Sequence, residues 1–174
     1  MINSRDIKDL RPDVAGACDI FVKVCKLRGL NVLITQTLRD NEYQAALYAQ
    51  GRTKPGAIVT NSKTVTYHSG LAFDICKNVK GHEYDDPEFF KKCAAIAKSM
   101  GFSWGGDWKK FPDRPHFQWD NNGKATSYKT VPAMKYYDNF ADLQRRSGLA
   151  YDTMLYLAAY DYGGDLIRKL ACMD

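Results

Sequence analysis

The spacing of apolar and polar residues predicts helices and strands in the first half of the chain. Apolar residues recur at helical spacing in RPDVAGACDIFVKVCKLRGL, where Gly29 supplies a helix stop. The β-branched run NVLITQTL, residues 31–38, is typical of a strand. A second helix is predicted between an Asp40 N-cap and a stop at Gly51.

The second half continues with GLAFDICK as a buried strand and DDPEFFKKCAAIAKSMG as the clearest helix, with Pro87 in its first turn and Gly101 past its end. HFQW, residues 116–119, reads as a third strand, and FSWGGDWKKFPDRP before it reads as an aromatic loop. Strands and helices are mixed without regular alternation. This pattern favours an α+β fold over a doubly wound parallel sheet.

The chain divides by composition into a main domain over residues 1–125, a polar, turn-rich linker over 126–136 and a short all-helical C-terminal module over 137–174. Breaks at Ser147-Gly148 and Gly163-Gly164 interrupt the module. About 40 residues rarely support a core alone. We therefore expect this module to dock on the main domain, to form homo-oligomers, or to do both.

The composition is that of a soluble globular protein, with 45% hydrophobic and 26% charged residues among 174. No apolar run approaches the ~20 residues that a membrane span needs. The five cysteines are scattered without CxxC spacing, so we expect them to be reduced and structural. The N-terminal residues lack the basic and apolar regions of a signal peptide, so synthesis in a cytoplasm is expected.

The charge is uneven along the chain. Residues 1–132 carry 20 Lys/Arg against 14 Asp/Glu, whereas the remainder carries 5 against 6. A basic front part suggests an anionic partner, either nucleic acid or an acidic polymer such as a cell wall. The sequence has no nucleic-acid recognition motif, so no nucleic-acid partner is expected.

The candidate chemistry begins with three histidines, of which His68 and His116 stand at the mouths of predicted strands. Together with Asp74 they make two imidazoles and one carboxylate, a set that suits a single catalytic Zn²⁺. Six residues of straight strand span roughly 20 Å. His68 and Asp74 can share a metal only if the chain folds back between them, which Ser69-Gly70 permits. His82 precedes a helix and is expected in an exposed loop.

Asp113 stands three residues before His116, at the distance of a general base that takes a proton from a water near the metal. Asp107 competes for this role but lacks the fixed spacing to His116. Arg39, at the end of the first strand, is the candidate cation for a developing oxyanion.

The segments TLRDNEYQAALYAQGR, YHSGLAFD and DRPHF, taken together, resemble the zinc D-Ala-D-Ala metallopeptidase family, and most closely its L-alanyl-D-glutamate endopeptidases of phage endolysins and wall-remodelling enzymes. The family signature runs Ser-x-His-x-x-Gly-x-Ala-x-Asp, then Asp/Glu-x-x-His, after an Arg-Ser-x-x-x-Gln element. The match spans roughly residues 10–119. It implies a small antiparallel sheet flanked by helices, as in the Hedgehog signalling domain.

The resemblance implies catalytic and binding roles for seven residues. Asp113 would be the base and Arg39 the oxyanion stabiliser, the metal ligands would be His68, Asp74 and His116, and Gln44 and Thr66 would contact substrate. The sequence departs from the signature in three ways. Thr66 replaces serine, Asp40 replaces the serine after Arg39, and the His68–Asp74 interval is one residue shorter, so the turn there must be tighter.

The function implied is an endolysin that hydrolyses the L-Ala–D-Glu amide of the peptidoglycan stem peptide and acts on the bacterial cell wall after release from the cytoplasm. The 137–174 module would then target the wall or mediate self-association. One alternative is a D,D- or L,D-carboxypeptidase, which needs a cation for a free carboxylate, with Arg52, Lys54 or Arg114 as candidates. Another is a non-catalytic wall-binding protein.

Overall fold

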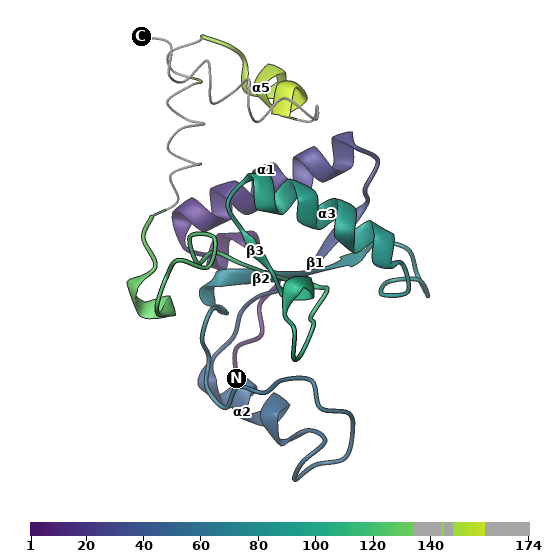
Figure 1. The fold of residues 1–174 in the computed structure, drawn as a ribbon, viewed down its shortest axis with the longest axis vertical. Coiled ribbons are helices and arrows are strands. Elements are labelled where there is room, and N and C mark those ends of the chain that lie inside the picture. The colour runs from purple at the N-terminus through teal and green to yellow at the C-terminus, as the bar shows by residue number, and fades with distance from the viewer. Residues whose placement is uncertain (134–143, 145–147, 159–174) are drawn as a thin grey trace.

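The computed structural model describes residues 1–133, 144 and 148–158. Its helices and strands lie in a mixed order along the chain, as Figure 1 shows. The predicted α+β class is confirmed. The elements are η1 (Ile7–Asp9), α1 (Pro12–Leu27), β1 (Val32–Leu38), α2 (Asn41–Ala49), β2 (Ser69–Lys77), α3 (Pro87–Ser99), β3 (Ser103–Trp104), η2 (Gly105–Asp107), β4 (His116–Gln118), η3 (Tyr128–Thr130) and α5 (Tyr151–Ala158).

The four strands form one antiparallel sheet in the order β1-β2-β4-β3. β2 is central and pairs with β1 on one side and with β4 on the other. The three strands expected from the sequence are present. The two-residue β3 was missed, because it is too short to show a period of two and lies in the segment predicted as an aromatic loop.

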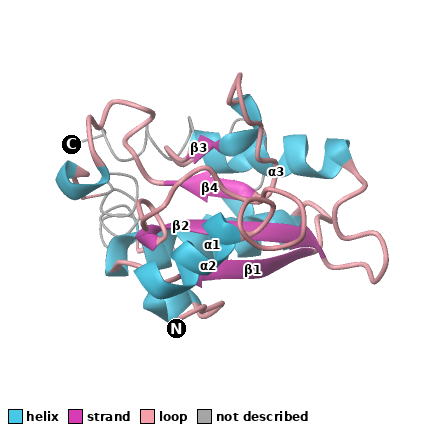
Figure 2. Ribbon diagram, turned by 90° about the horizontal axis from the view of Figure 1, so that it is seen from below, coloured by secondary structure: helices cyan, strands magenta, loops and turns pink. Residues whose placement is uncertain are grey.

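Helices α1 and α3 cover one face of the sheet, and α2 lies beyond the opposite face (Figures 1 and 2). The core between sheet and helices centres on Phe21 of α1, Phe73 of β2 and Phe117 of β4, whose ring centroids lie 5.5–5.6 Å apart. Burying a large aromatic side chain removes roughly 150–250 Å² from water. This cluster therefore fixes the sheet against α1. It also fixes the positions of the side chains that the strands carry on the opposite face.

Two helix starts carry side-chain caps. The Asp40 side chain accepts a hydrogen bond from the Tyr43 N–H at the start of α2, as predicted, and Asp86 accepts one from the Phe89 N–H at the start of α3. Four of the five cysteines lie in the described part of the chain, where they are buried and free, as expected, and Cys172 lies outside it. No helix in this part is long and apolar enough to cross a bilayer.

Helix α5 packs on α1. Met154 is fully buried in the core cluster, and the Tyr151 ring lies 4.9 Å from the Lys23 Nζ. The segment predicted as a linker is also tied to the main body, because the Trp119 Nε1–H donates to the Pro132 carbonyl at 2.7 Å. The division into 1–125, 126–136 and 137–174 stays a prediction, and most of the last range lies outside the described residues.

Candidate metal centre and catalytic cleft

The face of the sheet away from α1 and α3 carries a cavity of about 480 Å³. Its floor comes from the sheet and its walls from the loop after α2 and the loop before β4. The lining includes six of the seven residues that the sequence singled out, namely Arg39, Thr66, His68, Asp74, Asp113 and His116. The cavity is the candidate catalytic cleft.

Asp74 and His116 reach the cleft through strand pairing. They are direct partners in the antiparallel ladder between β2 and β4, and Phe73 and Phe117 are the next pair along. Side chains alternate between faces along a strand. The two phenylalanines therefore enter the core, while the carboxylate and the imidazole point together into the cleft.

His68 reaches Asp74 because β2 is irregular at its start. From the pair Leu38–Ser69 to the pair Gln36–Asp74, β2 advances five residues while β1 advances two. Gly70 has φ +106°, a conformation that side chains rarely adopt, and its carbonyl accepts from the Arg11 N–H at 2.9 Å. The chain thus folds back at Ser69-Gly70 as predicted.

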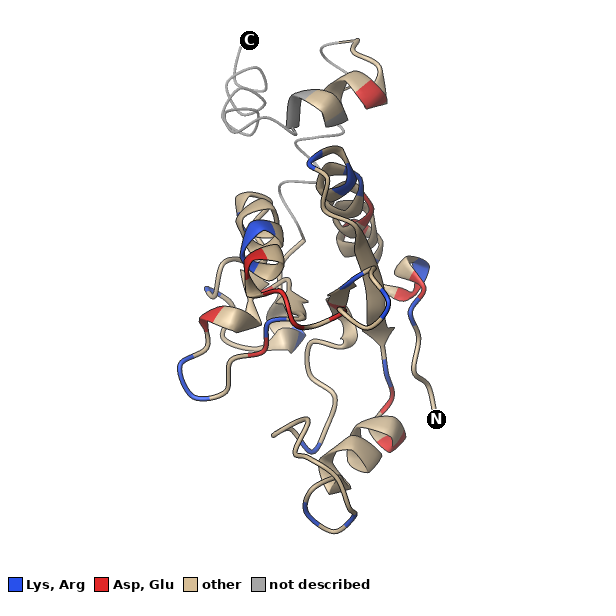
Figure 3. Ribbon diagram, turned by 90° about the vertical axis from the view of Figure 1, so that its right-hand side faces the viewer, with Lys and Arg blue, Asp and Glu red and all other residues tan. Residues whose placement is uncertain are grey.

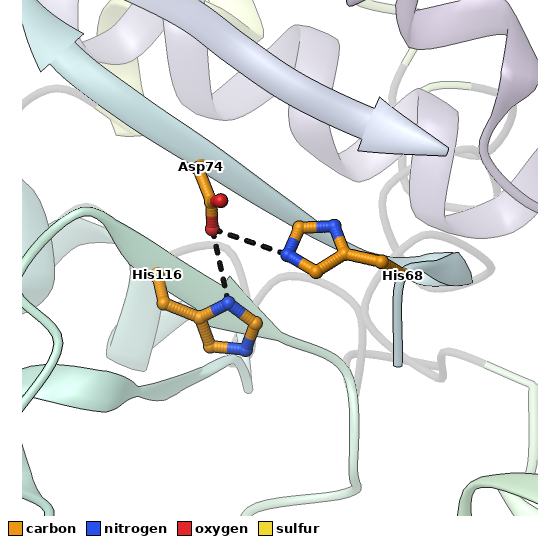
Figure 4. A group of neighbouring side chains, drawn as sticks. All are labelled: His68, Asp74 and His116. Carbon is orange, nitrogen blue, oxygen red and sulfur yellow. Dashed lines mark hydrogen bonds and ion pairs between the residues drawn. The ribbon is translucent and has the colours of Figure 1, made fainter. Parts of the chain in front are cut away.

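The three side chains meet at one carboxylate oxygen (Figure 4). The Asp74 Oδ1 lies 3.3 Å from the His68 Nε2 and 3.0 Å from the His116 Nδ1. Burial opposes ionisation of Asp74, but the two imidazoles outweigh it and hold the pKa of this carboxyl well below its usual range. Burial also favours the neutral form of His116, yet Asp74 raises the pKa of this ring.

The outer nitrogen of each imidazole has its own acceptor. The His68 Nδ1 lies 3.0 Å from the Thr37 carbonyl, and the His116 Nε2 lies 3.0 Å from the Gln118 Oε1. Neutral rings that donate outward present bare lone pairs inward. Two lone pairs and a carboxylate oxygen then face one another.

This arrangement fits a bound cation. One ligand atom from each of the three residues lies within 4.8 Å of the other two. Two imidazoles and a carboxylate are a zinc-type donor set that leaves a fourth position for water or substrate. An acceptor for each outer nitrogen is the usual arrangement around metal-bound histidines.

Asp113 lies at the edge of this group, in the loop between η2 and β4. Its N–H donates to the Gly105 carbonyl at 2.9 Å, and its own carbonyl accepts from the His116 N–H at 3.3 Å. Burial, helped by the neighbouring Asp74, raises the pKa of its carboxyl, which is the direction useful for a proton acceptor. Asp107, the competing candidate, pairs with Lys98 and does not line the cavity.

Arg39 stands at the end of β1, where its Nη1 donates to the Gln36 Oε1 at 2.6 Å. Burial lowers the pKa of its guanidinium, and the nearby carboxylates oppose this shift. Its Nε is buried without a hydrogen-bond partner. An unpaired buried donor is costly unless something else satisfies it, so the guanidinium is placed to donate a hydrogen bond to a bound ligand.

The other residues that the sequence analysis named differ in their positions relative to the cleft. Thr66 lines the cleft. Gln44 does not, because it is fully buried behind the wall, where its Nε2 donates to the Ser62 carbonyl at 2.6 Å and to the Thr60 Oγ1 at 3.2 Å. Its position makes it a support for the loop that forms the wall. His82 is exposed and lies 2.6 Å from the Asp85 carboxylate, as expected for a loop residue.

The sequence reasoning passed over several residues at the site. Trp108 lines the cleft with its ring centroid 5.1 Å from that of His116, and Phe111 lies in the same wall. Gln118 and Asp120 continue the polar side of β4. The alternation of polar and aromatic residues in HFQWD was the available signal for the last two.

Asp113 also lines a second cavity of about 440 Å³. Its other lining residues include Tyr84, Phe90 and Arg114. Arg52 and Lys54 lie on the loop after α2, whose charged side chains are all basic (Figure 3). Arg52 donates to the carbonyls of Tyr48 and Thr60 and so braces this loop.

Comparisons with known proteins point in one direction. A family model described as D-alanyl-D-alanine carboxypeptidase matches residues 60–119, the segment that holds His68, Asp74, Asp113 and His116. The chain is 39% identical over 122 residues to the peptidoglycan L-alanyl-D-glutamate endopeptidase CwlK of Bacillus subtilis (strain 168), covering 63% of this chain and 73% of that protein.

The chain is also 39% identical over 127 residues to the L-alanyl-D-glutamate peptidase of Listeria phage A118, covering 70% of this chain and 42% of that protein. Among solved structures, that of the Serratia marcescens L-Ala D-Glu endopeptidase ChiX aligns with a TM-score of 0.48 and 17% identity, covering 67% of this chain and 87% of that one.

Proposed function

The chain belongs to the D-alanyl-D-alanine metallopeptidase family, and from that premise we propose that it is a zinc-dependent peptidoglycan hydrolase that cleaves the L-Ala–D-Glu amide of the stem peptide. The observation that carries the proposal is the convergence of His68, Asp74 and His116 on one point beside Asp113. The names of the Bacillus and Listeria phage relatives support the choice of bond.

The three converging residues would hold the zinc ion. Zinc in such a site acidifies a coordinated water and polarises a carbonyl. Asp113 takes the proton of the attacking water and returns it to the leaving amine, since its raised pKa lets it act in both directions. Arg39 donates to the developing oxyanion with its guanidinium group, since this residue lines the cleft.

The cleft favours an endopeptidase over a carboxypeptidase. A carboxypeptidase needs a cation for the free terminal carboxylate. Among the described residues, the cleft is lined by one cation, Arg39, which the oxyanion role occupies. Arg52 braces a loop, and Arg114 lines the second cavity.

We propose the bacterial cell wall as the place of action, reached after synthesis in the host cytoplasm in the manner of a phage endolysin. The phage relative supports this context. The basic loop after α2 (Arg52, Lys54 and Lys63) supports attraction to an anionic wall. In this proposal residues 137–174 assist by targeting the wall or by self-association.

Mass spectrometry of purified peptidoglycan, digested with and without a chelator, tests the proposal. The expected result is new fragments that begin at D-Glu, absent with chelator and restored by added Zn²⁺. Loss of a terminal D-Ala instead would establish the carboxypeptidase. A protein that binds zinc but cleaves none of several wall types would be a wall-binding protein, and one that cleaves equally well in chelator would refute the metal centre.

A further inference from the structure

A buried chain of polar side chains runs away from the metal centre along one face of β4. His116, Gln118 and Asp120 alternate with Phe117 and Trp119, so the three polar residues share the face that the aromatic residues do not. All three are buried, with 6–7% of each residue exposed. Buried polar groups in such a chain are costly unless each one is satisfied.

Each member of the chain has a partner. The His116 Nε2 lies 3.0 Å from the Gln118 Oε1, and the Gln118 Nε2 donates to the Asp120 Oδ2 at 2.9 Å. The other oxygen of Asp120 accepts from the Ser103 hydroxyl at 2.6 Å and from the Gly123 N–H at 2.8 Å. Asp120 is therefore surrounded by three donors.

The direction of this chain follows from the chemistry of its end. An ionised carboxylate only accepts hydrogen bonds. Gln118 must therefore turn its NH₂ group toward Asp120, which leaves its carbonyl oxygen facing His116. A carbonyl oxygen also only accepts, so the His116 Nε2 must carry a proton. The nitrogen left for a metal is then Nδ1, which lies on the side of Asp74, 3.0 Å from its Oδ1.

We propose that Asp120, acting through Gln118, is a positioning residue that fixes the tautomer of His116 with Nδ1 free for the metal. The inference rests on the metal centre of the proposed function. His68 needs no such device, because its Nδ1 faces the backbone carbonyl of Thr37, which can only accept. The partner of His116 is the Gln118 amide, which could turn either its oxygen or its NH₂ group toward the ring. The charge of Asp120 selects the orientation in which the oxygen faces His116.

The variant Asp120→Asn reverses the direction of the hydrogen bonds that run from His116 through Gln118 to residue 120. Gly123 and Ser103 keep the amide oxygen of the new side chain on their side, since the backbone N–H of Gly123 can only donate. The NH₂ group of the introduced asparagine then faces Gln118, whose amide must turn its oxygen toward it. Gln118 would now offer NH₂ to the His116 Nε2, and the ring proton moves to Nδ1, where it points at Asp74.

The double variant Gln118→Glu with Asp120→Asn restores the original direction of these hydrogen bonds. The introduced glutamate has one oxygen for the His116 N–H and a second for the NH₂ group of the introduced asparagine, so the chain again ends in an acceptor at His116. Gln118→Glu alone places two carboxylates at the 2.9 Å contact and destabilises the chain by repulsion. Asp85→Asn, an exposed site on the loop before α3, is the matched control.

The experiment measures zinc affinity by competition with a chelator, and the rescue by the double variant distinguishes positioning of His116 from a general loss of structure. Loss of an outer partner of a metal-bound histidine typically lowers affinity by roughly 10–100-fold. We expect the zinc affinity of Asp120→Asn to fall by a factor in this range. The double variant should return to within about threefold of wild type, and the control should not change.

Unchanged zinc affinity in Asp120→Asn would overturn the inference, and so would a double variant that binds zinc as weakly as the single one. If Asp120→Asn does not fold, Gln118→Met tests the same link, because it removes the acceptor while Asp120 keeps Ser103 and Gly123. Its affinity should fall at least about tenfold, and wild-type affinity would refute the role. A wild-type protein that binds no zinc would instead sink the proposed function.

Discussion

The substitution Gly105→Ala tests how closely the catalytic loop must fit. Gly105 lies against the residues that carry the chemistry, because a Cβ there would stand 2.5 Å from the Asp113 carbonyl oxygen and 3.1 Å from the His116 Cβ. Its φ lies outside the left-handed region, so space and not backbone conformation requires glycine. Alanine can be accommodated only if the 105–113 loop moves.

The distance by which the loop must move determines the expected loss of catalytic rate. Ordinary contact begins near 3.4 Å, so the Asp113 carbonyl must retreat by about 0.9 Å, whereas His116 needs only about 0.3 Å. A misplacement of about 1 Å can cost on the order of 100-fold in rate, which corresponds to ~2.7 kcal/mol. Overpacking itself costs roughly 1–3 kcal/mol of stability. We expect a large loss of kcat/KM with a much smaller loss of zinc affinity.

The assay follows cleavage of a soluble muropeptide at saturating zinc, with urea unfolding and chelator competition on the same samples. Gly29→Ala is the matched control. It makes the same change far from the cleft, where a Cβ meets nothing within 4 Å but φ is +74°. Its stability should fall by about 1 kcal/mol while kcat/KM stays at the wild-type value.

A folded Gly105→Ala protein with kcat/KM within about threefold of wild type would refute the reasoning, because the position of Asp113 would then not limit the reaction. A rate that recovers fully as zinc is raised would also refute it, since the damage would then run through His116 and the metal.

Three further substitutions have defined outcomes. Asp113→Asn should keep zinc and fold but lose at least about 100-fold in kcat, whereas Asp107→Asn should stay near wild type; the reverse result would move the base to Asp107. Met154→Ala should lower the free energy of unfolding by roughly 2–5 kcal/mol, and an unchanged urea midpoint would contradict the packing of α5 on α1. Asp86→Asn keeps the helix cap but loses the hydrogen bond from Lys77 that holds the pKa of Asp86 below its usual value. That contribution is present above the ordinary carboxyl pKa and is lost as pH falls through the lower folded-state value, so the stability curves of variant and wild type should converge in acid and diverge at neutral pH.

The sequence predicted the helices well because their signals are local. Asp40 and Asp86 cap the helices that follow them, and the glycines after α1 and α3 have positive φ. The strands were found where burial gives a long apolar run, as in β2. The two-residue β3 was missed, because it is a strand only through its pairing with β4.

The site was predictable as a set of residue types but not as a geometry. The sequence named His68, Asp74 and His116 and indicated that the chain could fold back at Ser69-Gly70, but it did not show the irregular pairing of β2 with β1 that brings the three side chains together. Gln44 illustrates the limit, because a motif position does not reveal whether a side chain faces the cleft or stands behind its wall. Gln118 and Asp120 escaped notice because a polar residue in a strand signals exposure until its burial is known.

The sequence by itself determined which groups are available for chemistry, since imidazole, carboxylate and guanidinium groups are properties of the residue types. It also determined the α+β class, through periodicities that depend only on neighbours along the chain. Tertiary structure alone decided which of those groups meet. The pairing of Asp74 with His116 across two strands, the irregular start of β2 that returns His68, and the buried partners of His116 depend on contacts between residues far apart in sequence, where no local pattern records the distance.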